Sequence, residues 1–129
     1  MDFYQENIID HGQHPHNWGL LPEYQLHAED ENPLCGDQLE LTLKVDEHNI
    51  VQRVGWNGQG CLISQATASI LGDELMGKSL DEIKHITSDD VMELLGIPIT
   101  MSRRKCALLS LKVAKAAAYN VERWTGDDE

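Results

Sequence analysis

Three cysteines in three different settings offer the clearest chemistry in this 129-residue sequence. Cys35 lies in a glycine-flanked loop, Cys61 follows a Gly-Gln-Gly run, and Cys106 follows a basic cluster. Each setting leaves a thiolate accessible or favours its negative charge. They form no CxxC pair, so only the fold can bring them together. With Asp37 they would offer four ligands to a thiophilic metal ion, although an unligated cysteine is often only a small buried hydrophobe.

The predicted elements place two of these cysteines at one end of a β-hairpin. Residues 38–45 alternate apolar and polar side chains, and residues 50–56 form a second strand after a short turn. Cys35 precedes the first strand and Cys61 follows the second, so hairpin pairing brings both to the same end of the sheet. Cys106 joins them if the last helix packs across the sheet with its N-terminus at that end. Two helix N-termini would then favour negative charge on the thiols.

The remaining pattern predicts helices around this hairpin and one further strand at its edge. The order of elements predicts an α+β fold in which a small antiparallel sheet of about three strands packs against several helices. We expect residues 1–129 to form a single domain whose residues 125–129 are a flexible acidic tail. The expected helices span residues 2–11, 62–76, 79–85, 87–96 and 102–124, and the edge strand spans residues 24–28.

The composition narrows the class of protein. A formal net charge of −12 argues against nucleic acid as a partner and favours basic proteins or metal cations. No apolar run is long enough to span a membrane, and the N-terminus lacks the regions of a signal peptide, so we expect a cytoplasmic protein. Thiols stay reduced in the cytoplasm, which makes metal binding or reactivity a better interpretation of three cysteines than disulfides.

The neighbours of the cysteines refine the predicted site. Asp37 lies two residues after Cys35, so a strand-like pitch would turn both side chains the same way. A carboxylate is a hard ligand among soft thiolates, and such a mixed site suits transfer better than permanent structure. The basic residues before Cys106 are Arg103, Arg104 and Lys105, which either activate the thiol, dock a partner or form a solvated helix start.

A second group of metal-binding side chains lies near the N-terminus. His11, His14 and His16 cluster in a segment that reads as a loop. Such tracts can bind metal, but histidines in loops are commonly just solvated.

Three cysteine motifs, in this order, resemble the U-type iron–sulfur cluster scaffold family, which includes IscU, SufU and the N-terminal domain of NifU. The resemblance extends over nearly the whole chain, including the segment from Tyr4 to His11. The motifs are Asn32-Pro33-Leu34-Cys35-Gly36-Asp37, Gly60-Cys61-Leu62-Ile63-Ser64 and Lys105-Cys106-Ala107-Leu108-Leu109.

This resemblance implies a role in iron–sulfur cluster assembly. It implies that a PLP-dependent cysteine desulfurase supplies sulfur, that a [2Fe–2S] cluster is assembled from iron and this sulfur, and that the cluster passes to apo-proteins. The implied ligands are Cys35, Asp37, Cys61 and Cys106, and zinc can occupy the same site. The protein would then be a scaffold or sulfur carrier rather than an enzyme.

The sequence departs from the IscU-type members of the family at two places and from the longer SufU members at a third. Lys105 stands where IscU-type members have a histidine, which favours Asp37 as the fourth ligand because a cationic lysine is a poor ligand. Residues 96–100 differ from the LPPVK segment to which a dedicated Hsp70-type chaperone binds, so that partner is doubtful. The chain also lacks the insertion of longer SufU members and therefore resembles a compact SufU-like form.

Three functional hypotheses remain open at this point. In the first, a scaffold assembles a cluster, with Cys35 as the preferred sulfur acceptor and Cys106 as the alternative, activated by Arg104 and Lys105. In the second, a zinc-dependent sulfur acceptor stimulates a SufS-like desulfurase. In the third, a structural zinc domain serves as an interaction module and unfolds when its metal is removed.

Overall fold

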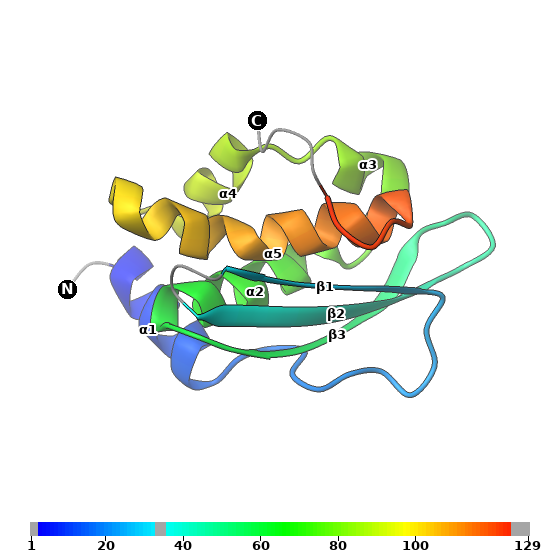
Figure 1. The fold of residues 1–129 in the computed structure, drawn as a ribbon, viewed down its shortest axis with the longest axis horizontal. Helices are drawn as coiled ribbons and strands as arrows, with labels where there is room; N and C mark the ends of the chain where they lie inside the picture. Colours follow the sequence, from blue (N-terminus) through cyan, green and yellow to red (C-terminus); the bar gives the residue numbers. More distant parts are fainter. Residues whose placement is uncertain (1–2, 33–35, 125–129) are drawn as a thin grey trace.

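An antiparallel three-stranded sheet forms one layer of the fold, and helices cover one of its faces (Figure 1). The computed structural model describes residues 3–32 and 36–124. The described chain runs α1 (Phe3–Gln13), β1 (Leu26–Asn32), β2 (Asp37–Val45), β3 (Val51–Gln59), α2 (Leu62–Leu75), α3 (Leu80–Lys84), α4 (Ser88–Leu95) and α5 (Met101–Tyr119). This arrangement confirms the predicted α+β class. Cys35 and the predicted tail, 125–129, lie outside the described residues.

The central hairpin follows the alternation of its first strand. Strand β2 pairs with β3 so that Leu41 lies opposite Trp56 and Leu43 opposite Val54. Strand β3 continues to Gln59, three residues beyond its predicted end, because Gly58 does not break it. A Cβ at Gly58 would overlap the carbonyl oxygen of Gln38 on β2, so glycine permits a close approach of the two backbones here.

The edge strand is longer and lies later in the sequence than predicted. Strand β1 pairs with β2 from Leu26, opposite Leu43, to Asn32, opposite Asp37. The predicted strand, 24–28, ended early because residues 29–32 are polar and acidic, a composition with little intrinsic preference for strands. Pairing with an already alternating neighbour extends β1 through this segment, and Asn32 is buried at its end.

Local capping signals define the two short helices as predicted. The side chain of Ser79 accepts a hydrogen bond from the backbone N–H of Glu82, whose carboxylate accepts from the N–H of Ser79. Thr87 and Asp90 form the same reciprocal pair at the start of α4. Helix α4 ends at Gly96, which adopts the left-handed conformation that glycine favours.

The long last helix is shorter at its end than predicted. Helix α5 begins at Met101 after Thr100, rather than with Ser102 as its cap, and it ends before Asn120. Asn120 has left-handed backbone angles and its N–H caps the last carbonyl groups. The helix therefore stops short of Trp124, and Val121, which falls within the predicted helix 102–124, is exposed beyond its end.

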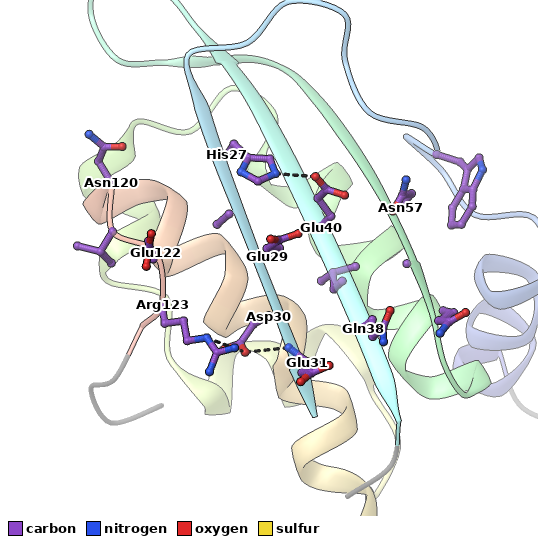
Figure 2. A pocket seen from close by; sticks show the side chains of 16 residues that line it. His27, Glu29, Asp30, Glu31, Gln38, Glu40, Asn57, Asn120, Glu122 and Arg123 are labelled. Carbon is purple, nitrogen blue, oxygen red and sulfur yellow. Dashed lines mark hydrogen bonds and ion pairs between the residues drawn. The ribbon is translucent and has the colours of Figure 1, made fainter. Parts of the chain in front are cut away.

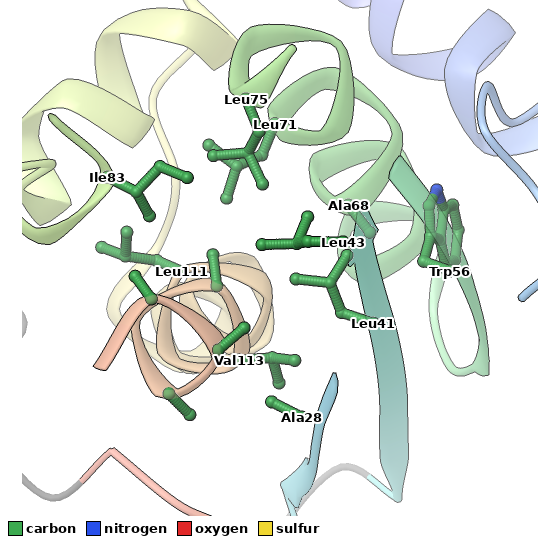
Figure 3. Close-up of a cluster of buried hydrophobic side chains, with 14 of the residues drawn as sticks. Ala28, Leu41, Leu43, Trp56, Ala68, Leu71, Leu75, Ile83, Leu111 and Val113 are labelled. Carbon is green, nitrogen blue, oxygen red and sulfur yellow. The ribbon is translucent and has the colours of Figure 1, made fainter. Parts of the chain in front are cut away.

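One hydrophobic core joins the sheet to the helices (Figure 3). Helix α5 packs on β1 and β2, while α2 packs on β3 and α1 packs on α2. Fully burying an aliphatic side chain contributes about 1.5–3 kcal/mol, so we expect this core to keep the protein folded without a metal ion. None of the described helices is long and apolar enough to cross a membrane. The core side chains labelled in Figure 3 include Leu41, Leu43, Leu71, Leu75, Ile83, Leu111 and Val113.

Candidate metal centre

Three chain segments bring Asp37, Cys61 and Cys106 together. Asp37 is the first residue of the central strand β2, Cys61 occupies the N-cap position of α2, and Cys106 lies in the second turn of α5. One ligand atom from each residue lies within 4.8 Å of the others. Figure 1 shows why: the start of β2, the end of β3 and the N-terminal turns of α5 meet at the same end of the molecule.

The carboxylate of Asp37 is fully buried and only half satisfied. Its Oδ1 atom accepts the backbone N–H of Cys61 at 3.0 Å. Its Oδ2 atom is buried without a hydrogen-bond partner among the described residues. A buried polar atom left without a partner costs about 1–3 kcal/mol, and more when it is charged. A cation bound between this carboxylate and the two thiols would remove that cost, so the residues fit a metal ion or cluster.

Gly60 permits this arrangement because it lies directly against the carboxylate. A Cβ at Gly60 would overlap Oδ1 of Asp37 and lie 3.0 Å from Oγ of Ser64. Its φ of +156° also lies outside the range that L-residues favour. Its contact with Asp37 depends on the pairing of β2 with β3 and could not be seen in the sequence.

The two thiols differ in burial and in their electrostatic setting. Cys106 is 2% exposed, whereas Cys61 is half-buried, so the cluster is reached from the side of Cys61. The N-terminus of α2 favours negative charge at its N-cap, where Cys61 lies. The same effect, expected for Cys106, is weak because it fades beyond the first turn of a helix and Cys106 lies in the second turn of α5.

The three basic residues before Cys106 differ in their burial and contacts. Arg104 is half-buried, and its Nη2 atom donates to Oγ of Ser88, a buried residue of α4, at 3.1 Å. Arg103 and Lys105 are exposed. Arg104 therefore ties α5 to α4, and the roles assigned to Arg104 and Lys105 in activating a thiol stay predictions.

The predicted histidine group is only partly assembled. His11 is the last residue of the predicted helix and the first of the predicted loop; it is buried in α1, which continues to Gln13. His16 lies beside it with a ring-centroid distance of 4.3 Å. Asp73 of α2, and not His14, is the third side chain that could hold a metal ion with them. No signal near the histidines in the sequence could have identified this aspartate.

A third polar group lines an open pocket on the outer face of the sheet (Figure 2). Nε2 of His27 lies 2.6 Å from Oε2 of Glu40, and Glu29 stands opposite Glu40 in the strand register. These side chains are exposed or half-exposed, so water can solvate their charges. The group has the character of a solvated sheet face, and the chemistry of the buried cysteine cluster is more specific.

The chain matches known proteins over nearly its whole length. The family model described as NifU-like N terminal domain matches residues 3–127. The zinc-dependent sulfurtransferase SufU of Bacillus subtilis is 33% identical, and the match covers 92% of this chain and 91% of SufU. The iron-sulfur cluster assembly scaffold protein IscU of Escherichia coli K12 is 32% identical, over 88% of this chain and 90% of IscU. These matches confirm the resemblance drawn from the cysteine motifs.

Solved structures show the same fold. The SufU protein of Fervidobacterium islandicum AW-1 superposes with a TM-score of 0.77 at 22% identity, covering 88% of this chain and 94% of that chain. The N-terminal part of a nitrogen-fixing NifU-like protein from Brucella abortus gives a TM-score of 0.77 at 18% identity, over 92% and 93% of the two chains. The arrangement of sheet and helices is therefore shared despite low identity.

Proposed function

Because this chain belongs to the family of NifU-like N-terminal domains, we propose that it is a scaffold on which an iron–sulfur cluster is assembled and from which the cluster passes to apo-proteins. One observation of the structure carries this proposal. The buried, unpartnered Oδ2 atom of Asp37 lies in a cluster with the thiols of Cys61 and Cys106. Thiolates are the usual ligands of iron–sulfur clusters, and the orphan carboxylate oxygen marks where a positive charge belongs.

The mixed donor set supports transfer of the cluster rather than permanent storage. Cys61 and Cys106 supply soft sulfur ligands, and we assign Cys35 as the third. Asp37 supplies a hard oxygen ligand, which suits iron and zinc less than a thiolate does. Its Oδ1 atom is held by the backbone N–H of Cys61 while Oδ2 stays available to a metal, so the carboxylate can keep its position when the cluster leaves.

Sulfur transfer requires an exposed thiolate on the acceptor. The acceptor thiolate attacks the outer sulfur of a persulfide on a PLP-dependent cysteine desulfurase, and the donor cysteine departs as a thiolate. Cys106 is 2% exposed, so a donor sulfur cannot reach it without movement of the surrounding chain. Burial therefore assigns Cys106 to ligation, and Cys35 stays the proposed acceptor because of its glycine-flanked position in the sequence. The reduced thiols that this chemistry needs favour the cytoplasm as the compartment.

Anaerobic reconstitution tests the scaffold function. The protein is purified without air, its metal content is measured, and absorption spectra are recorded after iron, cysteine and a desulfurase are added. We expect the spectrum of a [2Fe–2S] cluster, which Cys61→Ser and Cys106→Ser should abolish. His48→Gln, a substitution in the exposed turn before β3, is the matched control and should leave the spectrum unchanged. Normal assembly by either serine variant would remove that cysteine from the site.

A zinc-dependent sulfur acceptor is the second candidate function. Lys105, which is exposed beside the buried Cys106, offers no imidazole nitrogen as a fourth ligand. The relative that is named a zinc-dependent sulfurtransferase is 33% identical to this chain. Zinc would be held by Cys35, Asp37, Cys61 and Cys106, and it would keep the ligating thiols deprotonated. Stoichiometric zinc, no cluster and accelerated desulfurase turnover in the same experiment would favour this function over the scaffold.

A further inference from the structure

A second cluster of metal-binding side chains lies along helix α2, apart from the cysteines. His11 comes from α1, His16 from the segment that follows it, and Asp73 from α2. One ligand atom from each lies within 4.8 Å of the others. We propose that His11, His16 and Asp73 form a second site that binds a divalent transition-metal ion such as Zn²⁺, independently of the cysteine cluster.

The donor set selects the class of ion. Two imidazole nitrogens with one carboxylate oxygen suit Zn²⁺ and other first-row transition ions, whereas Mg²⁺ and Ca²⁺ prefer oxygen ligands alone. His11 is 7% exposed, but the side chains of His16 and Asp73 are each 48% exposed. The cluster is therefore closed on one side by protein and open to solvent on the other, so an ion can enter and keep water ligands.

Polar partners already orient both imidazole rings. Nδ1 of His11 lies 2.7 Å from Oγ of the fully buried Ser69, which leaves Nε2 of His11 as its nitrogen for a metal ion. Nδ1 of His16 lies 2.6 Å from Oδ2 of Asp73. Metal-binding histidines commonly use one nitrogen for the metal and the other for an outer partner, which is the role of Ser69 for His11. At His16, the ion would replace the hydrogen bond to Asp73, because both side chains are proposed ligands.

The backbone that carries His16 is held in place by a buried tryptophan. The indole Nε1–H of Trp56 donates to the carbonyl oxygen of His16 at 2.8 Å, and its backbone N–H donates to the carbonyl of Asn17 at 3.0 Å. The N–H of His16 donates to Oγ of Ser69 at 2.7 Å. The side chain of Asn17 also donates to Oδ1 of Asp73 at 2.9 Å. The three ligands are thus ordered before an ion arrives, which lowers the entropic cost of binding.

Burial and neighbouring charges act on His11 in opposite directions. Burial, and then the nearby His16, lower the pKa of His11 below its usual 6.5, while Asp73 and Asp10 oppose this shift. The two rings lie 4.3 Å apart between centroids, so two protonated imidazoles would repel each other. A metal ion bound by both rings would avoid this repulsion, because imidazoles bind metals in their neutral form, and the carboxylate of Asp73 would attract the ion.

Metal titration of the full chain tests this site. Zn²⁺ is titrated anaerobically against a chromophoric chelator into the wild-type protein, Cys61→Ser/Cys106→Ser and His16→Gln. We expect two zinc equivalents for the wild type and one for each variant. Co²⁺ bound to the cysteine variant should show d–d bands without the thiolate-to-cobalt charge-transfer band, because its ligands are nitrogen and oxygen.

Matched substitutions separate this site from other exposed histidines. His48→Gln removes a histidine that is exposed in a turn outside this cluster, and it should keep both zinc equivalents. His16→Gln should weaken the second site by at least ~10-fold, the lower bound for losing a partner of a metal site. A second equivalent unchanged in His16→Gln, or absent from the wild-type protein, would overturn the proposal. Neither result would affect the cysteine site, whose occupancy the His16→Gln spectrum reports separately.

Discussion

Two polar clusters lie along helix α2, and in both of them the ligand atoms lie within 4.8 Å of one another. They differ in the hydrogen bonds that their carboxylates make. In the cysteine cluster, Oδ2 of the fully buried Asp37 has no hydrogen-bond partner among the described residues. In the histidine cluster, Oδ1 of Asp73 accepts from Asn17 and Oδ2 contacts His16, while the side chain stays half-exposed. The first cluster lacks a positive charge, whereas the second is satisfied by its own hydrogen bonds.

This difference predicts different strengths of metal binding. A cation in the cysteine cluster removes the cost of a buried carboxylate oxygen without a partner among the described residues, so binding is coupled to stability. A cation in the histidine cluster must replace hydrogen bonds that already exist and charges that water already screens. We therefore expect the cysteine cluster to bind tightly and the histidine cluster to exchange its ion readily.

Removing one ligand from each cluster should give the largest effect. Cys106→Ala should weaken zinc binding at the cysteine cluster by more than the ~10–100-fold typical of losing an outer partner, because a direct ligand is lost. Asp73→Asn should weaken only the zinc equivalent that is bound at the histidine cluster. Zinc titration with a competing chelator measures both affinities. Loss of both equivalents in either single variant would show that the two clusters are one coupled site.

Adding a methyl group beside each cluster should show how tightly each one is packed. Gly60→Ala should destabilise the metal-free protein by about 1–3 kcal/mol and weaken zinc binding, because the new Cβ displaces the carboxylate of Asp37. Gly72→Ala on α2 meets Nδ2 of Asn17 only at 3.3 Å. There the helical gain of about 0.5–1 kcal/mol offsets the contact. Urea unfolding of both variants measures the difference, and equal losses would contradict a tighter cysteine cluster.

Deleting a buried hydroxyl should test whether the histidine cluster is satisfied by its own hydrogen bonds. Ser69→Ala removes the partner of both Nδ1 of His11 and the backbone N–H of His16, so we expect a loss of about 1–3 kcal/mol. The matched control is Ser110→Ala on α5, whose buried hydroxyl has no hydrogen-bond partner among the described residues. The control should be neutral or stabilising in thermal or urea unfolding. A comparable loss in both variants would mean that packing, not hydrogen bonding, orders the cluster.

Asp46, a carboxylate at the surface, serves as a comparison for the two clusters because its partners are hydrogen-bond donors alone. Oδ1 of Asp46 accepts the N–H groups of Ile50 and His48, and these bonds lower the pKa of Asp46 below 3.8. A lowered pKa in the folded state adds stability above pH 3.8 that is lost as pH falls through the folded value. Asp46→Ala should therefore lose less stability than the wild type between pH 7 and pH 3.

Urea midpoints across this pH range measure the effect, with Glu93→Gln on the exposed face of α4 as the charge-matched control. Identical pH profiles for the wild type and Asp46→Ala would mean that the turn contributes no linked stability. This is the smallest of the expected effects, because the carboxylate is exposed and its hydrogen bonds compete with water.

Elements with strong local signals were predictable from the sequence. The alternation from Gln38 to Val45 forms β2, and the reciprocal capping pairs at Ser79 and Thr87 begin α3 and α4. These features depend on residues within one or two turns of each other, so short-range physics determines them. The polar edge strand β1 and the end of α5 were misjudged because pairing with β2 and the left-handed Asn120 decide them.

For the function, the sequence alone determined the residue types that can hold a metal and, through three ordered cysteine motifs, the family to which they belong. Only the tertiary structure decided which partners those residues have. It buries Asp37 with one oxygen unpaired, places Gly60 against it, and brings Asp73 to the two histidines. The reason is physical: burial and long-range contact arise only when separate elements pack, and no local pattern in the chain encodes them.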